Sequence, residues 1–66
     1  MQIKVNGRLY NFNDNITLET IINQLNISSQ NIIAEVNGYV ITKEKFSQTV
    51  IEDNSVIELI KFVGGG

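Results

Sequence analysis

The chain has 66 residues, carries a formal net charge of −2 at pH 7, and contains neither cysteine nor histidine. A chain of this length forms one small domain and buries only ~60% of its unfolded surface, which leaves no room for an enclosed active site. Because thiols and imidazoles supply many of the usual nucleophiles, general bases and metal ligands, we expect a protein that is not an enzyme and that binds neither a metal nor a cofactor.

Residues 1–12 are predicted to form a β-hairpin. Apolar and polar side chains alternate over the first six residues, which is the period of a half-buried strand. The Asn6-Gly7 pair then gives a strong hairpin signal, because a type I′ turn requires positive φ at both central positions. The returning strand places Tyr10 and Phe12 on one face, and a cluster of Asn and Asp residues ends it as a loop.

A short helix is predicted to begin after Thr17, a suitable N-cap residue, with Glu19 in the first turn where the helix dipole favours an anion. Asn26 is suited to end this helix, because Asn tolerates the left-handed conformation better than most residues. The apolar stripe of the helix, at positions i, i+3, i+4 and i+7, consists of Leu18, Ile21, Ile22 and Leu25. In a chain this short the sheet needs a cover, so we expect this stripe to lie in the core rather than to bind a partner.

The middle of the chain predicts a second hairpin. Residues 32–36 alternate between two faces and indicate a third strand. The Asn37-Gly38 pair predicts another tight turn, followed by a short returning strand over residues 39–41. Residues 43–48 contain one apolar anchor, Phe46, and are expected to form a single helical turn.

The last strand is predicted over residues 56–62, after a polar turn at residues 52–55. It runs directly into Val63-Gly64-Gly65-Gly66. Glycine loses more backbone entropy on ordering than any other residue and has no side chain to pack. We therefore expect a folded domain over residues 1–62 and a flexible glycine tail over residues 63–66.

This order of elements predicts an α+β fold, with one mixed sheet of four to five strands and one main helix packed across one face. If the first and last strands pair in parallel at the centre of the sheet, the arrangement is the β-grasp, or ubiquitin-like, fold. Periodicity does not determine strand order, so the parallel pairing is a hypothesis.

Few side chains are candidates for chemistry. The cationic residues are scattered, without the basic stripe that a nucleic-acid backbone requires. Glu52 and Asp53 lie in a predicted surface turn and show no convergence on a pocket, and the Asn-Gly pairs lack the spacing of a phosphate-binding loop. No apolar run approaches the ~20 residues of a membrane span, and no signal peptide opens the chain. We expect a cytoplasmic protein, monomeric alone, with no nucleic-acid or membrane partner.

The remaining candidate is the terminal carboxylate of Gly66. A carboxylate is a poor electrophile and must be activated, typically as an acyl-adenylate made from ATP in the buried site of a separate enzyme. Gly64 and Gly65 suit entry into such a site, because a chain without Cβ atoms can pass closely between backbone walls. Once activated, the Gly66 carbonyl can accept an amine, an alcohol or sulfide, and the tail alone does not select among them.

Several short motifs follow one another along the chain and together point to one family. They are Met1-Gln2-Ile3, Asn6-Gly7, Thr17-Leu18 with Leu25, residues 34–38, Glu52-Asp53 before Val56, and Val63-Gly64-Gly65-Gly66. Each motif is weak, but their order combined with a Gly-Gly end is more specific, and with them the whole chain resembles the ThiS family, the sulfur carrier proteins of thiamine biosynthesis. At the turn before the last strand, Asn54 stands where family members often carry Gly.

The resemblance implies a specific sequence of partners. A ThiF-type, E1-like adenylyltransferase would use ATP to activate Gly66, and a cysteine desulfurase pathway would provide the sulfur that converts it to a thiocarboxylate. The carrier would then dock on a ThiG-type thiazole synthase and donate that sulfur to the thiazole ring. We expect docking through Ile60, Phe62 and Val63, beside the tail, although Phe62 could instead belong to the core.

Three alternatives share the fold. A MoaD-like carrier or a carrier for tRNA thiolation would use the same chemistry with another acceptor, and a ubiquitin-like modifier would join Gly66 to lysines. A TGS-like binding module would have no terminal chemistry. This chain is shorter than the other carriers, which favours thiazole synthesis among these pathways.

Overall fold

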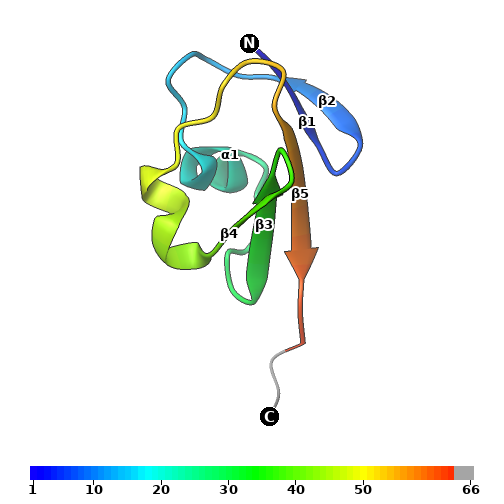
Figure 1. The fold of residues 1–66 in the computed structure, drawn as a ribbon, viewed down its shortest axis with the longest axis vertical. Coiled ribbons are helices and arrows are strands. Elements are labelled where there is room, and N and C mark those ends of the chain that lie inside the picture. Colours follow the sequence, from blue (N-terminus) through cyan, green and yellow to red (C-terminus); the bar gives the residue numbers. More distant parts are fainter. Residues whose placement is uncertain (64–66) are drawn as a thin grey trace.

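The computed structural model describes residues 1–63 and contains one five-stranded mixed sheet with helices on one face (Figure 1). Spatial order in the sheet is β2-β1-β5-β3-β4. Along the chain, an α-helix connects β2 to β3 and a 3₁₀ helix connects β4 to β5. The elements in chain order are β1 (Gln2–Val5), β2 (Arg8–Asn11), α1 (Leu18–Gln24), β3 (Ile32–Val36), β4 (Tyr39–Ile41), η1 (Lys43–Gln48) and β5 (Val56–Lys61).

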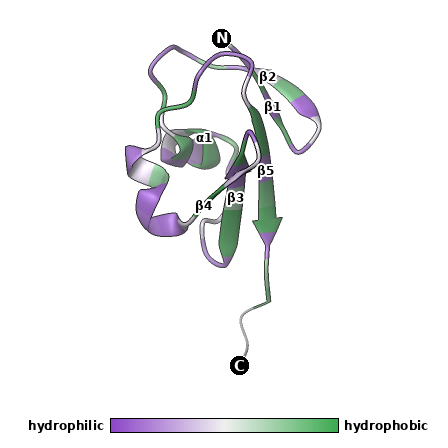
Figure 2. Cartoon of the chain, viewed as in Figure 1, coloured by the Kyte–Doolittle hydropathy of each residue, from purple (hydrophilic) through white to green (hydrophobic). Residues whose placement is uncertain are grey.

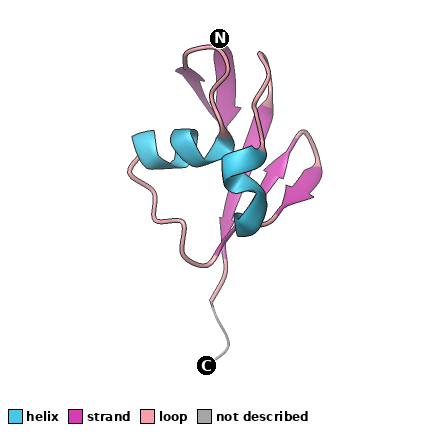
Figure 3. Ribbon diagram, turned by 90° about the vertical axis from the view of Figure 1, so that its left-hand side faces the viewer, coloured by secondary structure: helices cyan, strands magenta, loops and turns pink. Residues whose placement is uncertain are grey.

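The central pairing of the sheet confirms the hypothesis that the first and last strands run in parallel. β1 pairs with β5 in parallel, with Lys4 opposite Val56, while β5 pairs with β3 in the antiparallel sense. The last strand of the chain therefore has a neighbour on each side. Both helices lie in front of the same face in the view of Figure 3, so the predicted β-grasp arrangement is confirmed.

Both predicted Asn-Gly turns are present. Asn6 and Gly7 have φ values of 50° and 82°, and Asn37 and Gly38 have values of 51° and 87°. Positive φ at both central positions is the requirement of a type I′ turn, whose twist matches that of the flanking strands. The turns connect β1 to β2 and β3 to β4 as antiparallel hairpins.

The ends of α1 follow the sequence signals. The Thr17 hydroxyl accepts a hydrogen bond from the Thr20 N–H at 3.2 Å, which satisfies one of the free amides of the first turn. At the other end Asn26 has φ 58°, and the N–H of Ile27 donates to the carbonyl of Ile22 at 3.1 Å. Together with the bond from the Asn26 N–H to the Asn23 carbonyl, this is a Schellman motif.

The core lies between the sheet and the helices. Leu18, Ile21 and Ile22 are buried, so the stripe on α1 covers the sheet as expected, while Leu25 is partly buried at its margin. Phe46 anchors η1 with 1% of its surface exposed. Figure 2 shows β3 and β5 as the most continuously hydrophobic strands, in keeping with their central places in the sheet. The other core residues are Ile3, Val5, Ile16, Ile32, Ala34, Ile51 and Ile57.

The polar turn before β5 has a structural role beyond solubility. Glu52 and Asp53 are exposed, as expected, but the Asp53 carboxylate accepts a hydrogen bond from the Gln2 N–H at 2.8 Å. Asn54 has φ 65°, a conformation that glycine also adopts readily. The turn thus holds the start of β1 beside the start of β5.

No helix among the described residues has the length and apolar character needed to cross a membrane.

Candidate functional site: the end of β5 and the open face of the sheet

The strand that leads to the glycines is fixed by both hairpin turns. The Asn6 side-chain oxygen accepts a hydrogen bond from the Leu59 N–H at 2.8 Å, and the Asn37 side-chain oxygen accepts one from the Val56 N–H at 2.8 Å. At these two positions the partner of the β5 amide is a turn side chain rather than the backbone of a neighbouring strand. Each Asn therefore serves two purposes, because it adopts the left-handed turn conformation and also holds the central strand.

The chain leaves the sheet at Phe62. Its N–H donates to the carbonyl of Asn31 at 2.8 Å, and this bond fixes the point of departure one residue beyond β5. Val63 follows with 96% of its surface exposed. The predicted reactive and threading residues Gly64, Gly65 and Gly66 lie outside the described residues, so the division of the chain at residue 62 stays a prediction.

The alternation of β5 determines which side chains are available next to this exit. Ile57 is fully buried and Leu59 packs against the core, so Glu58 between them and Ile60 after them face away from the helices. Ile60 is 47% exposed and Phe62 is 44% exposed. All three predicted docking residues, Ile60, Phe62 and Val63, are at least partly exposed, and Phe62 lines a shallow depression beside Lys43 and Glu44 of η1. Their role in docking stays a prediction.

The sheet face without helices, called here the open face, contains a pair of carboxylates that the sequence pattern did not reveal. Glu35 on β3 lies directly opposite Glu58 on β5. The pairs on either side, Ala34 with Leu59 and Val36 with Ile57, point into the protein, which places both glutamates on the open face. Only the register between two distant strands brings these acids together, and no local signal reports it.

Titratable side chains are sparse around the exit in the described part of the chain. Residues 1–63 contain no group of three or more acidic side chains arranged to hold a metal ion. One carboxyl group is perturbed, because a backbone hydrogen bond and the Thr42 hydroxyl, at 3.0 Å, hold the pKa of Glu44 below its usual value. This group is fully exposed on η1, and its environment is that of a helix start rather than of an active site. The structure instead provides a strand hydrogen-bonded on both sides, an exposed point at which the chain leaves the sheet, and apolar side chains next to that point.

Comparison with known proteins agrees with this geometry. The crystal structure of the thiamine biosynthesis protein ThiS from Geobacter metallireducens superimposes with a TM-score of 0.84 and 26% sequence identity, and the alignment covers 100% of both chains. The sulfur carrier protein ThiS from Bacillus subtilis is 32% identical over 53 residues, which is 80% of this chain and 80% of that protein.

A longer relative is also similar over the whole chain. The thiazole synthase of Paramagnetospirillum magneticum is 29% identical over 66 residues, and this chain spans 20% of that protein's length. The family model described as the ThiS family matches residues 3–66, from the first strand through the three glycines. The fold, the sequence relatives and this match agree, and the chain belongs to the ThiS family.

Proposed function

We propose that this protein is a sulfur carrier of thiamine biosynthesis, which carries its sulfur as a thiocarboxylate on Gly66. The observation that carries the proposal is the family match, which extends through Gly66 and therefore includes the residues on which the chemistry would occur. The solved ThiS structure supports it, because that fold is reproduced over the full length of both chains. A small domain with an exposed exit for its last residues suits a co-substrate rather than an enzyme.

The chemistry begins on a partner enzyme. A carboxylate oxygen of Gly66 attacks the α-phosphorus of ATP in an E1-like, ThiF-type adenylyltransferase, pyrophosphate leaves, and an acyl-adenylate remains. The persulfide of a cysteine desulfurase pathway then displaces AMP to give an acyl disulfide, and a thiol reductant cleaves its S–S bond to leave a thiocarboxylate on Gly66 and a disulfide as the oxidised product. This carrier binds neither ATP nor the sulfur donor in a site of its own. Gly64 and Gly65 allow the end of the chain to enter the narrow site, because they have no Cβ atoms.

The thiocarboxylate then donates its sulfur for the thiazole ring on a ThiG-type synthase. The name of the Paramagnetospirillum relative supports this acceptor, because a protein called thiazole synthase contains a segment similar to the whole of this chain. Docking would use Ile60, Phe62 and Val63, which lie exposed next to the exit. We propose that the carrier acts in the cytoplasm as a monomer, without a nucleic-acid or membrane partner.

Reconstituted thiazole formation tests this function. The assay contains the carrier, the adenylyltransferase, the desulfurase and the synthase from the same genome, and it compares the natural chain with one lacking Gly66 and one extended by an alanine after Gly66. We expect the natural chain to support thiazole formation and both variants to be inactive, because each displaces the reactive carboxylate. An extended chain that is as active as the natural one would contradict the proposal.

A further inference from the structure

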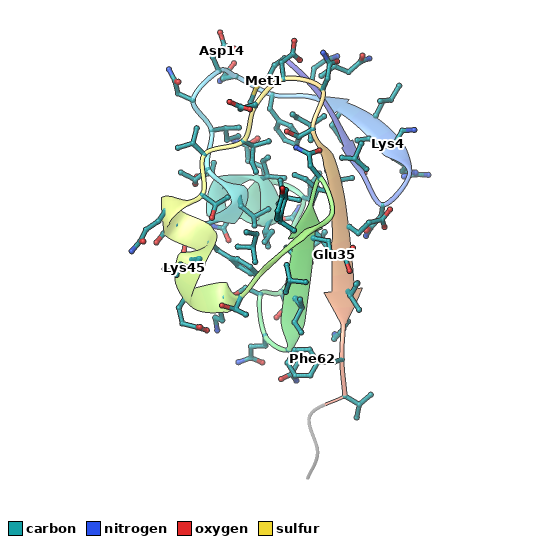
Figure 4. All side chains as sticks on the ribbon, in the orientation of Figure 1. Met1, Lys4, Asp14, Glu35, Lys45 and Phe62 are labelled. Atoms are coloured by element: carbon teal, nitrogen blue, oxygen red, sulfur yellow. The ribbon has the colours of Figure 1, made fainter. Side chains whose placement is uncertain are left out.

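Glu35 and Glu58 form an unusual feature of the open face. In an antiparallel pair, side chains directly opposite each other have Cβ atoms about 4.5–5.5 Å apart, and like charges in such a pair are destabilising. Glu35 is half-buried and Glu58 is exposed. Lys4, the cation nearest to them in register on this face, lies opposite Val56, one pair away from Glu58. Figure 4 shows Glu35 near the middle of the sheet and Lys4 on the N-terminal hairpin.

Apolar side chains border this acidic pair on two sides. The next pair toward the exit on the same face is Ile33 with Ile60, and Val40 lies opposite Glu35 on β4. Val40 is 62% exposed and Ile60 is 47% exposed. Ile60 is the last residue of β5 on this face, because Ile57, Leu59 and Lys61 alternate with it, and it lies two residues from Glu58, about 7 Å along an extended strand. The acidic pair therefore has apolar neighbours on two sides, toward β4 and toward the end of β5 where the chain leaves the sheet.

The position of the exit determines what can cover this surface. Whichever enzyme accepts the glycines must lie against the end of β5, next to Phe62 and Val63. An apolar partner surface placed over two carboxylates would remove their water of hydration. The free energy of this desolvation is unfavourable unless a cation of the partner pairs with the carboxylates. An arginine meets this need best, because its planar guanidinium can bond two carboxylates at once.

We propose that Glu35 and Glu58 together bind a cationic side chain of thiazole synthase, an arginine in the first instance, when the carrier docks on that enzyme through its open face. The proposal rests on the sulfur-carrier function and deepens it by naming a recognition element. Thiazole synthase is the occupant because a relative of that name contains a segment similar to this whole chain.

The test compares the natural carrier with Glu35→Gln, Glu58→Gln and the double variant, and with Glu52→Gln as a control. Glu52 is an exposed acid in the turn before β5, so its replacement removes one charge away from the open face. Binding to purified thiazole synthase is measured by calorimetry at low and moderate salt, and thermal unfolding is measured for each variant. We expect the double variant to bind about 30-fold or more weakly, with a smaller dependence on salt.

The double variant should unfold at the same or a higher temperature, because two opposed charges no longer repel. The control should match the natural protein in both measurements. Synthase binding that is unchanged in the double variant would overturn the proposal. A loss of binding to the adenylyltransferase alone would also overturn it. A dimer of the natural carrier that dissociates on the same substitutions would overturn it as well, because the two glutamates would then serve self-association.

Failure of this inference and failure of the carrier function give different results. If the natural chain gains no sulfur from the reconstituted adenylyltransferase and desulfurase, the carrier function fails and this proposal falls with it. If the natural chain gains sulfur and binds the synthase, but the double variant binds equally well, only the role of Glu35 and Glu58 is wrong.

Discussion

Asparagine recurs wherever the backbone of this protein turns sharply. Six asparagines have positive φ, and at Asn6 and Asn37 the side chain also accepts a hydrogen bond from β5. Glycine would provide the same backbone freedom but no acceptor. These two positions therefore connect turn chemistry to the stability of the strand that leads to the glycines. The sequence predicted the turns, but the contacts to Leu59 and Val56 depend on which strand lies alongside, which the Asn-Gly signal does not contain.

Substitution at Asn6 separates the two contributions. Asn6→Gly keeps the left-handed backbone and removes the bond to the Leu59 N–H, so we expect unfolding to need about 1 kcal/mol less free energy. Asn6→Ala should cost roughly a further 1 kcal/mol, because alanine is strained at positive φ. Asn6→Asp keeps both an acceptor and a tolerant backbone, and should remain close to the natural protein. Urea unfolding measures all three, and a glycine variant as stable as the natural chain would show that the bond contributes nothing.

At the scale of elements, β5 has two faces with different roles. Its inward face, represented by Ile57 at 0% exposure, belongs to the core, while its outward face carries Glu58 and Ile60, both exposed. The sequence alternation predicted two such faces without saying which one is buried. That choice depends on the register with β1 and β3, which places Ile57 opposite Val5 and Val36.

A pair of alanine substitutions tests this division of roles. Phe62→Ala should weaken binding to the partner enzymes about tenfold or more and change the melting temperature little, because the ring is 44% exposed in the free protein. Ile57→Ala should instead lower stability by roughly 2–5 kcal/mol, as expected for a fully buried side chain. Calorimetric binding and thermal unfolding distinguish the two effects. A large fall in melting temperature with unchanged docking for Phe62→Ala would assign this residue to the core after all.

At the scale of the whole molecule, the order of elements predicted a mixed sheet covered by one helix, while the parallel pairing of β1 with β5 was a hypothesis that the structure confirms. Two Asn-Gly turns, a capped amphipathic helix and alternating strands left few arrangements for a sheet that must be covered on one face. The candidate site was only partly predictable from the sequence. Position in the chain placed Ile60, Phe62 and Val63 beside the exit, but alternation did not say which face of the strand is exposed. The opposed pair Glu35 and Glu58 depends on a long-range register that no local pattern encodes.

The central claim, that sulfur is carried on Gly66, is tested most directly by the intact mass of the protein. The chain is incubated with ATP, cysteine, a cysteine desulfurase and the ThiF-type enzyme of the same genome, and the product is then fragmented to locate any change. Replacement of one oxygen by sulfur, mapped to Gly66, is the result we predict. An unchanged mass with an enzyme shown to be active, or a lysine conjugate without sulfur, would contradict the claim and favour a binding module or a protein modifier respectively.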